Sequence, residues 1–158
     1  MNKAFLLVVA IGAAIGLLLP TGKPQPRAAA ASVTKTVQAE TRIEREGNGH
    51  FYVDAEVNDE QLVHFMIDTG ASMVALTMED AERLGVPFSP SNFQVVGKGA
   101  SGEVRGQFVK LSRVSIEGKE VRNLDGAVIE GLGISLLGQS YLSRLGGIEI
   151  SGDSMTLR

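Results

Sequence analysis

The sequence contains no cysteine, and this absence removes several classes of chemistry at once. Disulfide bonds, thiolate nucleophiles and zinc–thiolate sites are all excluded. The compartment stays open, because periplasmic and cytosolic domains can both do without cysteine. The two histidines, His50 and His64, show no metal-binding spacing with a carboxylate. We therefore expect neither a metal ion nor an organic cofactor.

Positive charge and large aromatic residues are also scarce. The net charge is −3 and no basic stripe runs along the chain, so we expect no nucleic-acid partner. Tryptophan is absent while glycine occurs 19 times, a balance that favours short strands and tight turns over a helical bundle. The hydrophobic fraction of 44% and the charged fraction of 21% are typical of a folded domain with a core.

The N-terminus carries an uncharged apolar run from Ala4 to Leu19. Its length lies between that of a spanning helix and that of a signal-peptide core. We interpret residues 1–19 as a membrane anchor or signal segment, with an uncleaved anchor favoured over a cleaved signal. Residues 20–48, rich in proline and alanine, are interpreted as a flexible linker to one exported domain at 49–158.

Hydrophobic alternation predicts short β-strands throughout that domain. The predicted strands are 51–57, 62–67, 73–76, 93–96, 104–114, 114–116, 121–129 and two short strands around 151–153. A helix is predicted after Thr77 as N-cap, with Asp80 three residues on and Gly85 at its end. A second brief helical pattern covers 139–145. The predicted fold is mainly β, a closed or folded-over barrel with one or two short helices.

The strand at 62–67 runs directly into Asp68-Thr69-Gly70. A carboxylate behind an apolar run loses solvation, so it needs a partner or serves a function. Gly70 permits a tight turn, Thr69 can hydrogen-bond to a facing loop, and the Ser72 hydroxyl can hold the carboxylate from outside. The alternative is an ordinary turn closed by an Asx-type hydrogen bond. The apolar residues before Asp68, and Ala71-Ser72 after it, favour catalysis.

These residues resemble a known family. Phe65-Met66-Ile67-Asp68-Thr69-Gly70-Ala71-Ser72 is similar to the active-site loop of retropepsin-like aspartic proteases, the single-domain relatives of retroviral protease. Ile134-Ser135-Leu136-Leu137-Gly138 is similar to the second element of that family, in which two apolar residues and a glycine pack beneath the catalytic loop. The resemblance covers about 49–158 and, with the apolar N-terminus, is strongest to membrane-anchored bacterial members.

The resemblance implies a pepsin-like closed barrel and an aspartic endopeptidase that cleaves polypeptide substrates. Because the chain has one Asp-Thr-Gly, it also implies a homodimer in which Asp68 faces Asp68 of a second copy across a two-fold axis. Together with the N-terminal segment, it implies the bacterial inner membrane with the catalytic domain in the periplasm, or secretion if the segment is cleaved. A retropepsin-like dimerisation or binding domain without turnover, and an anchored structural β-domain, remain alternatives.

Other motifs in the sequence suggest different functions. Gly97, Gly99 and Gly102 spell G-x-G-x-x-G, but the alternating residues that follow predict a strand, where a dinucleotide site needs a helix. The family's flap, a hairpin over the active site, fits this stretch better. Glycine at position 70 excludes the second acid of an aspartyl-phosphate site. His64 is interpreted as a strand residue with a satisfied ring, because nothing positions Ser72 as its nucleophile.

Overall fold

The computed structural model describes residues 39–59, 61–99 and 102–158. The N-terminal segment 1–19 and the linker up to residue 38 therefore lie outside the described residues. Within the described ranges no helix is long and apolar enough to cross a membrane.

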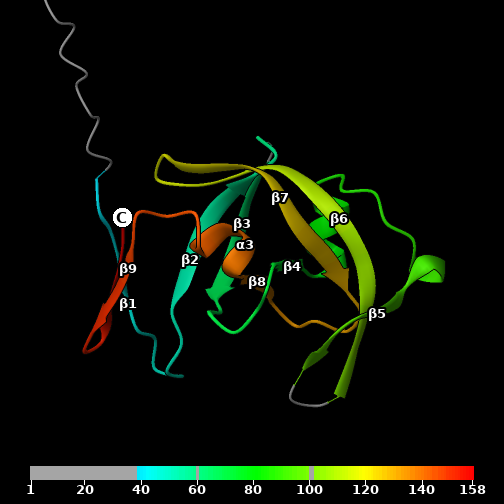
Figure 1. The fold of residues 1–158 in the computed structure, drawn as a ribbon, viewed down its shortest axis with the longest axis horizontal. Coiled ribbons are helices and arrows are strands. Elements are labelled where there is room, and N and C mark those ends of the chain that lie inside the picture. The colour runs from blue at the N-terminus through cyan, green and yellow to red at the C-terminus, as the bar shows by residue number, and fades with distance from the viewer. Residues whose placement is uncertain (1–38, 60, 100–101) are drawn as a thin grey trace, which may run out of the picture. The chain divides into compact units, whose positions relative to one another are not determined.

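The described chain forms ten strands, two short α-helices and one 3₁₀ turn (Figure 1). In chain order they are β1 (Thr41–Glu44), β2 (Tyr52–Val57), β3 (Gln61–Ile67), β4 (Val74–Leu76), α2 (Met78–Arg83), the 3₁₀ turn (Pro90–Asn92), β5 (Gln94–Gly99), β6 (Gly102–Ile116), β7 (Lys119–Ile129), β8 (Ser135–Leu137), α3 (Gln139–Leu142), β9 (Ile148–Ser151) and β10 (Ser154–Leu157). The predicted β-rich fold is confirmed. Several details differ. Residues 102–116 form one continuous strand of 15 residues, and β5 extends to Gly99 where the predicted strand ended at 96. β8 was not predicted as a strand, and α3 ends at Leu142 rather than at 145.

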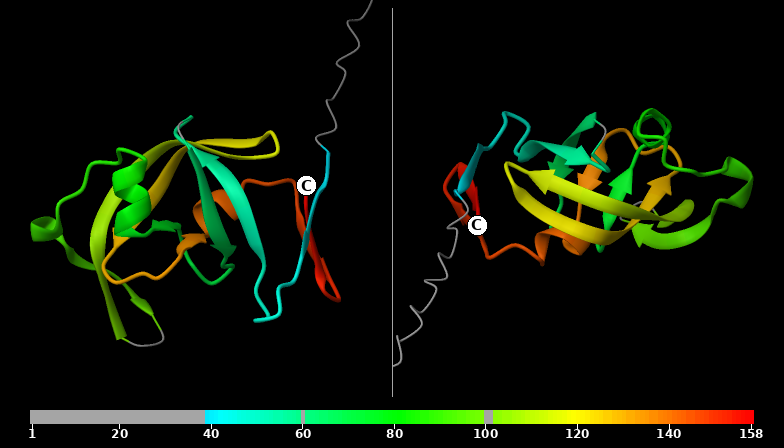
Figure 2. Two further views of the ribbon diagram at one scale, coloured as in Figure 1. Left: turned by 180° about the vertical axis from the view of Figure 1, so that it is seen from behind. Right: turned by 90° about the horizontal axis from the view of Figure 1, so that it is seen from above.

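Six of these strands close into a barrel. Their order is β2-β3-β8-β4-β7-β6, and pairing between β2 and β6 completes the ring. β5 pairs only with β6 in the described part of the sheet, and together they form a hairpin that extends beyond the ring. Figure 2 shows the long β6–β7 hairpin following one side of the barrel. The predicted closed barrel is confirmed.

The barrel interior follows from the alternation in the sequence. On β2 and β3 every second residue near their shared turn faces the core. On β6 the core residues lie in the half nearest the β6–β7 turn, whereas on β7 they extend from Val121 to Val128. The fully buried side chains include Val57, Val63, Phe65, Leu111, Leu124 and Leu137. These residues form one continuous core together with residues of α2 and α3. The core thus supports the strands that carry the Asp68 turn.

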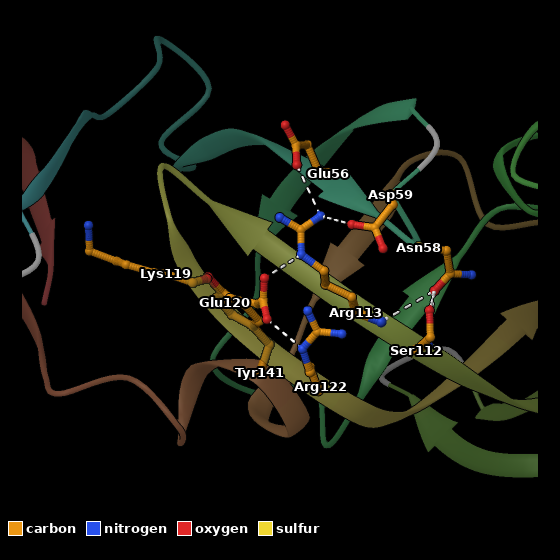
Figure 3. A network of polar contacts seen from close by, with 9 residues as sticks. All are labelled: Glu56, Asn58, Asp59, Ser112, Arg113, Lys119, Glu120, Arg122 and Tyr141. Atoms are coloured by element: carbon orange, nitrogen blue, oxygen red, sulfur yellow. Dashed lines mark hydrogen bonds and ion pairs between the residues drawn. The ribbon is translucent and has the colours of Figure 1, made fainter.

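Arg113 reinforces the place where β2 and β6 close the ring (Figure 3). Its guanidinium group donates to Glu120 at 2.6 Å and to Glu56 at 3.1 Å, and it also pairs with Asp59. Asn58, in the left-handed conformation at the β2–β3 turn, accepts hydrogen bonds from Ser112 N and Oγ. The Arg113 guanidinium group therefore binds carboxylates from both the β2–β3 hairpin and the β6–β7 hairpin.

The boundary at residue 49 needs correction, because β1 lies inside the predicted linker 20–48. β1, β10 and β9 form a separate three-stranded antiparallel sheet that also contains the C-terminal strand (Figure 1). Thr41 and Ile43 are buried opposite Leu157 and Met155. The four residues of β1 were too few for a strand to be predicted from their alternation. The segment is a strand because it pairs with β10, more than 100 residues away in the chain.

Buried Lys119 holds the start of β1 in place. Its side chain is 1% exposed, and its ammonium group donates to Thr41 Oγ1 at 2.7 Å and to the carbonyl oxygen of Ala39. A buried cation requires such acceptors, because an unpaired charge in the interior is costly. The contact ties the described N-terminal end of the chain to the β6–β7 turn.

Helix α2 begins as predicted, with the Asp80 N–H donating to Thr77 Oγ1 at 3.0 Å. The Asp80 carboxylate in turn accepts hydrogen bonds from Ser135 Oγ and from Arg83, both at 2.5 Å. Burial by itself raises the pKa of Asp80, but the hydrogen bonds from Ser135, Arg83 and Thr77 outweigh it and hold the pKa below the usual value. Asp80 thereby connects α2 to β8, beside the Asp68 turn.

We expect Asp80→Asn to lower the free energy of unfolding at neutral pH by about 1–2 kcal/mol, because hydrogen bonds to the charged carboxylate are lost. The lowered pKa means that this stabilisation is present above the unfolded-state pKa and disappears as the pH falls through the folded-state pKa. The variant and the wild-type protein should therefore converge in acid. Urea unfolding from pH 7 to pH 3 measures this. Glu79→Gln, at an exposed neighbour in the same turn, is the control, and a constant difference at all pH values would contradict the assignment.

Candidate active site

Asp68 lies at the end of β3, where the chain leaves the barrel. Its backbone N–H donates to the carbonyl of Leu137 at 3.1 Å, which continues the parallel pairing of β3 with β8. The carboxylate is half-buried, and Oδ1 accepts a hydrogen bond from Gly70 N at 2.8 Å. The Asx-type bond of an ordinary turn is thus present. The same hydrogen bond orients the carboxylate along the turn. Among the described residues no hydrogen bond to Oδ2 is found, so this oxygen can contact a ligand.

The segment that begins at Leu136 supports this turn from below. Gln139 N donates to the carbonyl of Ala71 at 2.8 Å, and Ser140 N donates to that of Ser72 at 3.1 Å. At Gly138 a Cβ would stand 2.2 Å from the carbonyl oxygen of Met73 and 2.7 Å from that of Ala71. Only glycine leaves room for so close an approach of two backbones. The predicted contact between Leu136-Leu137-Gly138 and the loop is therefore present, while its part in catalysis stays a prediction.

Ser72 differs from its predicted contact, whereas the predicted contact of Thr69 stays a prediction. Thr69 is exposed, and its carbonyl accepts from Gln139 Nε2 at 2.9 Å. A hydrogen bond from its side chain to a facing loop requires a second copy of that loop. Ser72 is exposed too, and in the described chain its hydroxyl makes no hydrogen bond to Asp68, so the predicted clamp on the carboxylate is absent. Ser72 supports the loop through its backbone carbonyl instead.

A cleft of about 570 Å³ opens beside Asp68. The turn residues Asp68, Gly70, Ala71 and Ser72 line one side, and the β5–β6 hairpin lines another. Gly97 and Gly99 from the predicted flap line the cleft, and Gly99 pairs with Gly102 as the last described pair of the hairpin. A strand follows the G-x-G-x-x-G stretch, as predicted, where a dinucleotide site would need a helix. The hairpin therefore occupies the position expected of a flap.

The cleft wall is a small apolar cluster separate from the main core. Ala75, Ala127 and Ile129 are its buried members. The half-buried side chains packed on them are Met73, Val96, Val104, Leu132 and Leu136. The alternation in 121–129 predicts a strand but not this surface, because alternation identifies a face without indicating what that face contacts.

Charged groups complete the cleft lining. Arg105 pairs with Glu130 at 3.3 Å and also donates to the carbonyl of Phe93 at 3.2 Å. Lys98 and Glu103 lie opposite each other on the hairpin and are exposed. The cleft thus combines a half-buried carboxylate, an apolar wall and a charged hairpin, an arrangement suited to an extended peptide.

His64 is separate from this site. It lies exposed on β3, its Nδ1 is 2.8 Å from Asp54 Oδ1, and its ring stacks on Tyr52 with centroids 5.3 Å apart. The prediction of a strand residue with a satisfied ring is confirmed.

Comparison with known proteins assigns the class of this fold. The family model described as "gag-polyprotein putative aspartyl protease" matches residues 53–144. The crystal structure of a retropepsin-like aspartic protease from Rickettsia conorii has a TM-score of 0.63 and 41% identity, and the match covers 75% of this chain and 90% of that one. The chain belongs to the retropepsin-like aspartic protease family, and the predicted resemblance is confirmed.

Other proteins are also similar to this chain. Uncharacterized protein RP867 of Rickettsia prowazekii (strain Madrid E) is 42% identical over 123 residues, and an uncharacterized protein in the cobV 5′ region of Sinorhizobium sp is 37% identical over 124 residues. Each match covers 77% of this chain but only 52% of the relative, so the chain spans about half the length of these curated relatives. EIAV protease complexed with the inhibitor HBY-793 shares the fold, with a TM-score of 0.51 and 18% identity over 75% of this chain and 100% of that one.

We expect Gly138→Ala to destabilise the protein by about 3 kcal/mol, because the new methyl group would collide with two backbone carbonyl groups that cannot move independently. Gly133→Ala is the matched control, since a Cβ at that position meets nothing within 4 Å. Thermal unfolding of both variants measures the difference. Equal melting temperatures for the two variants would contradict the close approach at Gly138.

Proposed function

We propose that the chain is an aspartic endopeptidase whose reaction centre is made by Asp68 from each of two identical chains. The observation that carries this proposal is the placement of Asp68 beside an apolar cleft, beneath the β5–β6 hairpin, in a member of an aspartic protease family. The substrate is a polypeptide that lies in the cleft in an extended conformation.

The need for two copies follows from the chemistry of one carboxylate. A carboxylate that activates water as a general base also needs an acid to protonate the developing oxyanion. The sequence has a single Asp-Thr-Gly. Glu130, another acid of the cleft, is paired with Arg105, and Glu103 is exposed on the hairpin. The exposed Thr69 and Gly70 beside Asp68 support a symmetric contact that brings a second Asp68 to the first.

In the proposed reaction the two Asp68 carboxyl groups share one proton and hold a water molecule between them. Two carboxylates in contact cannot both ionise easily, as the aspartic proteases themselves illustrate. The ionised Asp68 takes a proton from the water as its oxygen attacks the scissile carbonyl carbon, and the protonated Asp68 donates to the carbonyl oxygen. Transfer of a proton to the amide nitrogen then releases the amine. The shared proton predicts activity under mildly acidic conditions and loss of activity once both acids ionise.

We expect Asp68→Asn to abolish cleavage, by a factor of at least 1,000, while leaving the melting temperature close to that of the wild type. Cleavage of a denatured protein substrate across pH 4–8, followed by mass spectrometry, measures this. Asp153→Asn, an aspartate on the β9–β10 turn that is 86% exposed, makes the same chemical change outside the cleft and should retain activity.

Mixed dimers test the shared centre directly. Wild-type and Asp68→Asn chains with different tags are co-expressed, and the mixed dimer is isolated. This mixed dimer should lack activity, since its reaction centre holds only one Asp68 carboxyl group. Cleavage by the mixed dimer at half the wild-type rate would show that each chain works alone. Residual cleavage by the Asp68→Asn chain would overturn the catalytic assignment itself.

We further propose that the protein is held in the bacterial inner membrane by residues 1–19, with the protease domain in the periplasm. The support is the apolar run from Ala4 to Leu19 followed by a proline-rich stretch. In a Gram-negative host the full chain should stay with the membranes after an alkaline carbonate wash. Its C-terminal domain should be digested by added protease once the outer membrane is opened. Protection from that protease would contradict the proposed orientation, and release into the medium would favour a cleaved signal.

A further inference from the structure

A second cavity, of about 680 Å³, lies next to the Asp68 cleft and has no role in the mechanism above. We call it the Phe108 groove, and the lining residues used below are Ser72, Met73, Phe108, Lys110, Asp125 and Arg144. They come from the Asp68 loop, from β6 and β7, and from the turn after α3. The groove is thus bounded by the same loop that carries the proposed catalytic residue.

The strand register shows that the groove continues the cleft. Gly106 lies opposite Ile129, Phe108 opposite Ala127, and Lys110 opposite Asp125 in the antiparallel β6–β7 pair. Directly opposed residues, and residues two apart on one strand, share a face of the sheet. The cleft wall of Ile129 and Ala127 therefore passes along one face of β7 into Asp125 of the groove. Ser72 and Met73 line both cavities.

The groove offers an apolar contact. Phe108 is 49% exposed, on the same face of the hairpin as the buried Ala127. On the opposite face of β6, Val109 packs against the main core and Leu111 is fully buried. A large aromatic side chain left half in water at the end of a cleft is a typical contact for an apolar ligand group.

The groove also carries an excess of positive charge. Lys110 is paired with Asp125, so these two charges compensate each other. Arg144 donates to the carbonyl of Arg122 at 3.2 Å, and among the described residues no carboxylate lies within ion-pair distance of it. The guanidinium group has further N–H donors in a planar fork that suits a carboxylate. Arg144 thus leaves the groove with one uncompensated positive charge.

We propose that the Phe108 groove is a distal substrate-binding site that takes an apolar side chain against Phe108 and an acidic side chain beside Arg144. The proposal rests on the proposed protease function. Ile129 and Asp125 are four residues apart on β7, a span of about 13 Å at the rise of a β-strand. An extended substrate that runs along β7 therefore enters the groove about four residues beyond the residue that contacts Ile129. The groove selects substrates by sequence outside the residues at the scissile bond.

The test is a cleavage-site profile of the full chain on the denatured proteins of a bacterial proteome, read by mass spectrometry. For the wild type we expect Asp and Glu to be enriched at least threefold at one distal position, with apolar residues enriched next to it. Arg144→Glu should remove the acidic preference or convert it to one for Lys and Arg, and Arg144→Lys should keep it. Phe108→Ala should remove only the apolar preference.

Kinetics on one peptide from that profile separate binding from folding effects. Relative to a truncated peptide that ends before the distal positions, the long peptide should have a KM at least fivefold lower with a similar kcat. Arg144→Glu should raise the KM of the long peptide to that of the truncated one and leave the truncated peptide unaffected, a pattern that general loss of structure would not produce. Arg42→Glu, at a 72% exposed arginine of β1, is the matched charge control and should change neither.

The outcomes for the Phe108 groove and for the protease function can be told apart. Asp68-dependent cleavage with no distal preference, or with the same distal profile in Arg144→Glu as in the wild type, would overturn the Phe108 groove and leave the protease function intact. Absence of any Asp68-dependent cleavage would overturn the protease function and, with it, the groove.

Discussion

The site depends on one close contact between two backbones, that of Gly138 against the loop after Asp68. Gly138 approaches the carbonyl groups of Met73 and Ala71 so closely that no side chain fits. This approach allows the N–H groups of Gln139 and Ser140 to reach the loop carbonyls. Three hydrogen bonds, counting that from Asp68 N to Leu137, then fix a turn that would otherwise be free to move. The carboxylate is oriented by backbone geometry that the barrel supplies.

The two faces of β7 have different roles: one packs in the main core, and the other lines the proposed active-site cleft. One face of β7 contributes Leu124 and Val128 to the continuous core, while the other contributes Ala127 and Ile129 to the small cluster that lines the cleft. The cleft cluster remains partly open to solvent, so its surface is available for a ligand. Alternation along a strand makes this division possible, because successive side chains point to opposite faces.

Much of this could be predicted from local patterns. The alternation in 51–57, the Thr77 cap with Asp80, and the Asp-Thr-Gly turn behind an apolar strand each depend on neighbours within a few residues, and each is found in the structure. β1 could not be predicted, because a four-residue strand is stabilised by its pairing with β10 and by the contact of Lys119 with Thr41. Ser72 was predicted to hold the carboxylate of Asp68, but the turn directs its side chain elsewhere.

The amino-acid sequence by itself determined the β-rich class of fold and the position of the acid, because these follow from side-chain periodicity, turn-forming residues and a specific motif. The place of the hairpin beside the acid was expected only from the resemblance to the family. Tertiary structure alone decided what surrounds them. Arg144 and Phe108 lie 36 residues apart in the chain and become neighbours of Ser72 only through the β6–β7 register and the packing of α3. Such contacts form only when the whole barrel closes. They cannot be predicted from a short segment, because the strand pairing that stabilises them involves residues far apart in the chain.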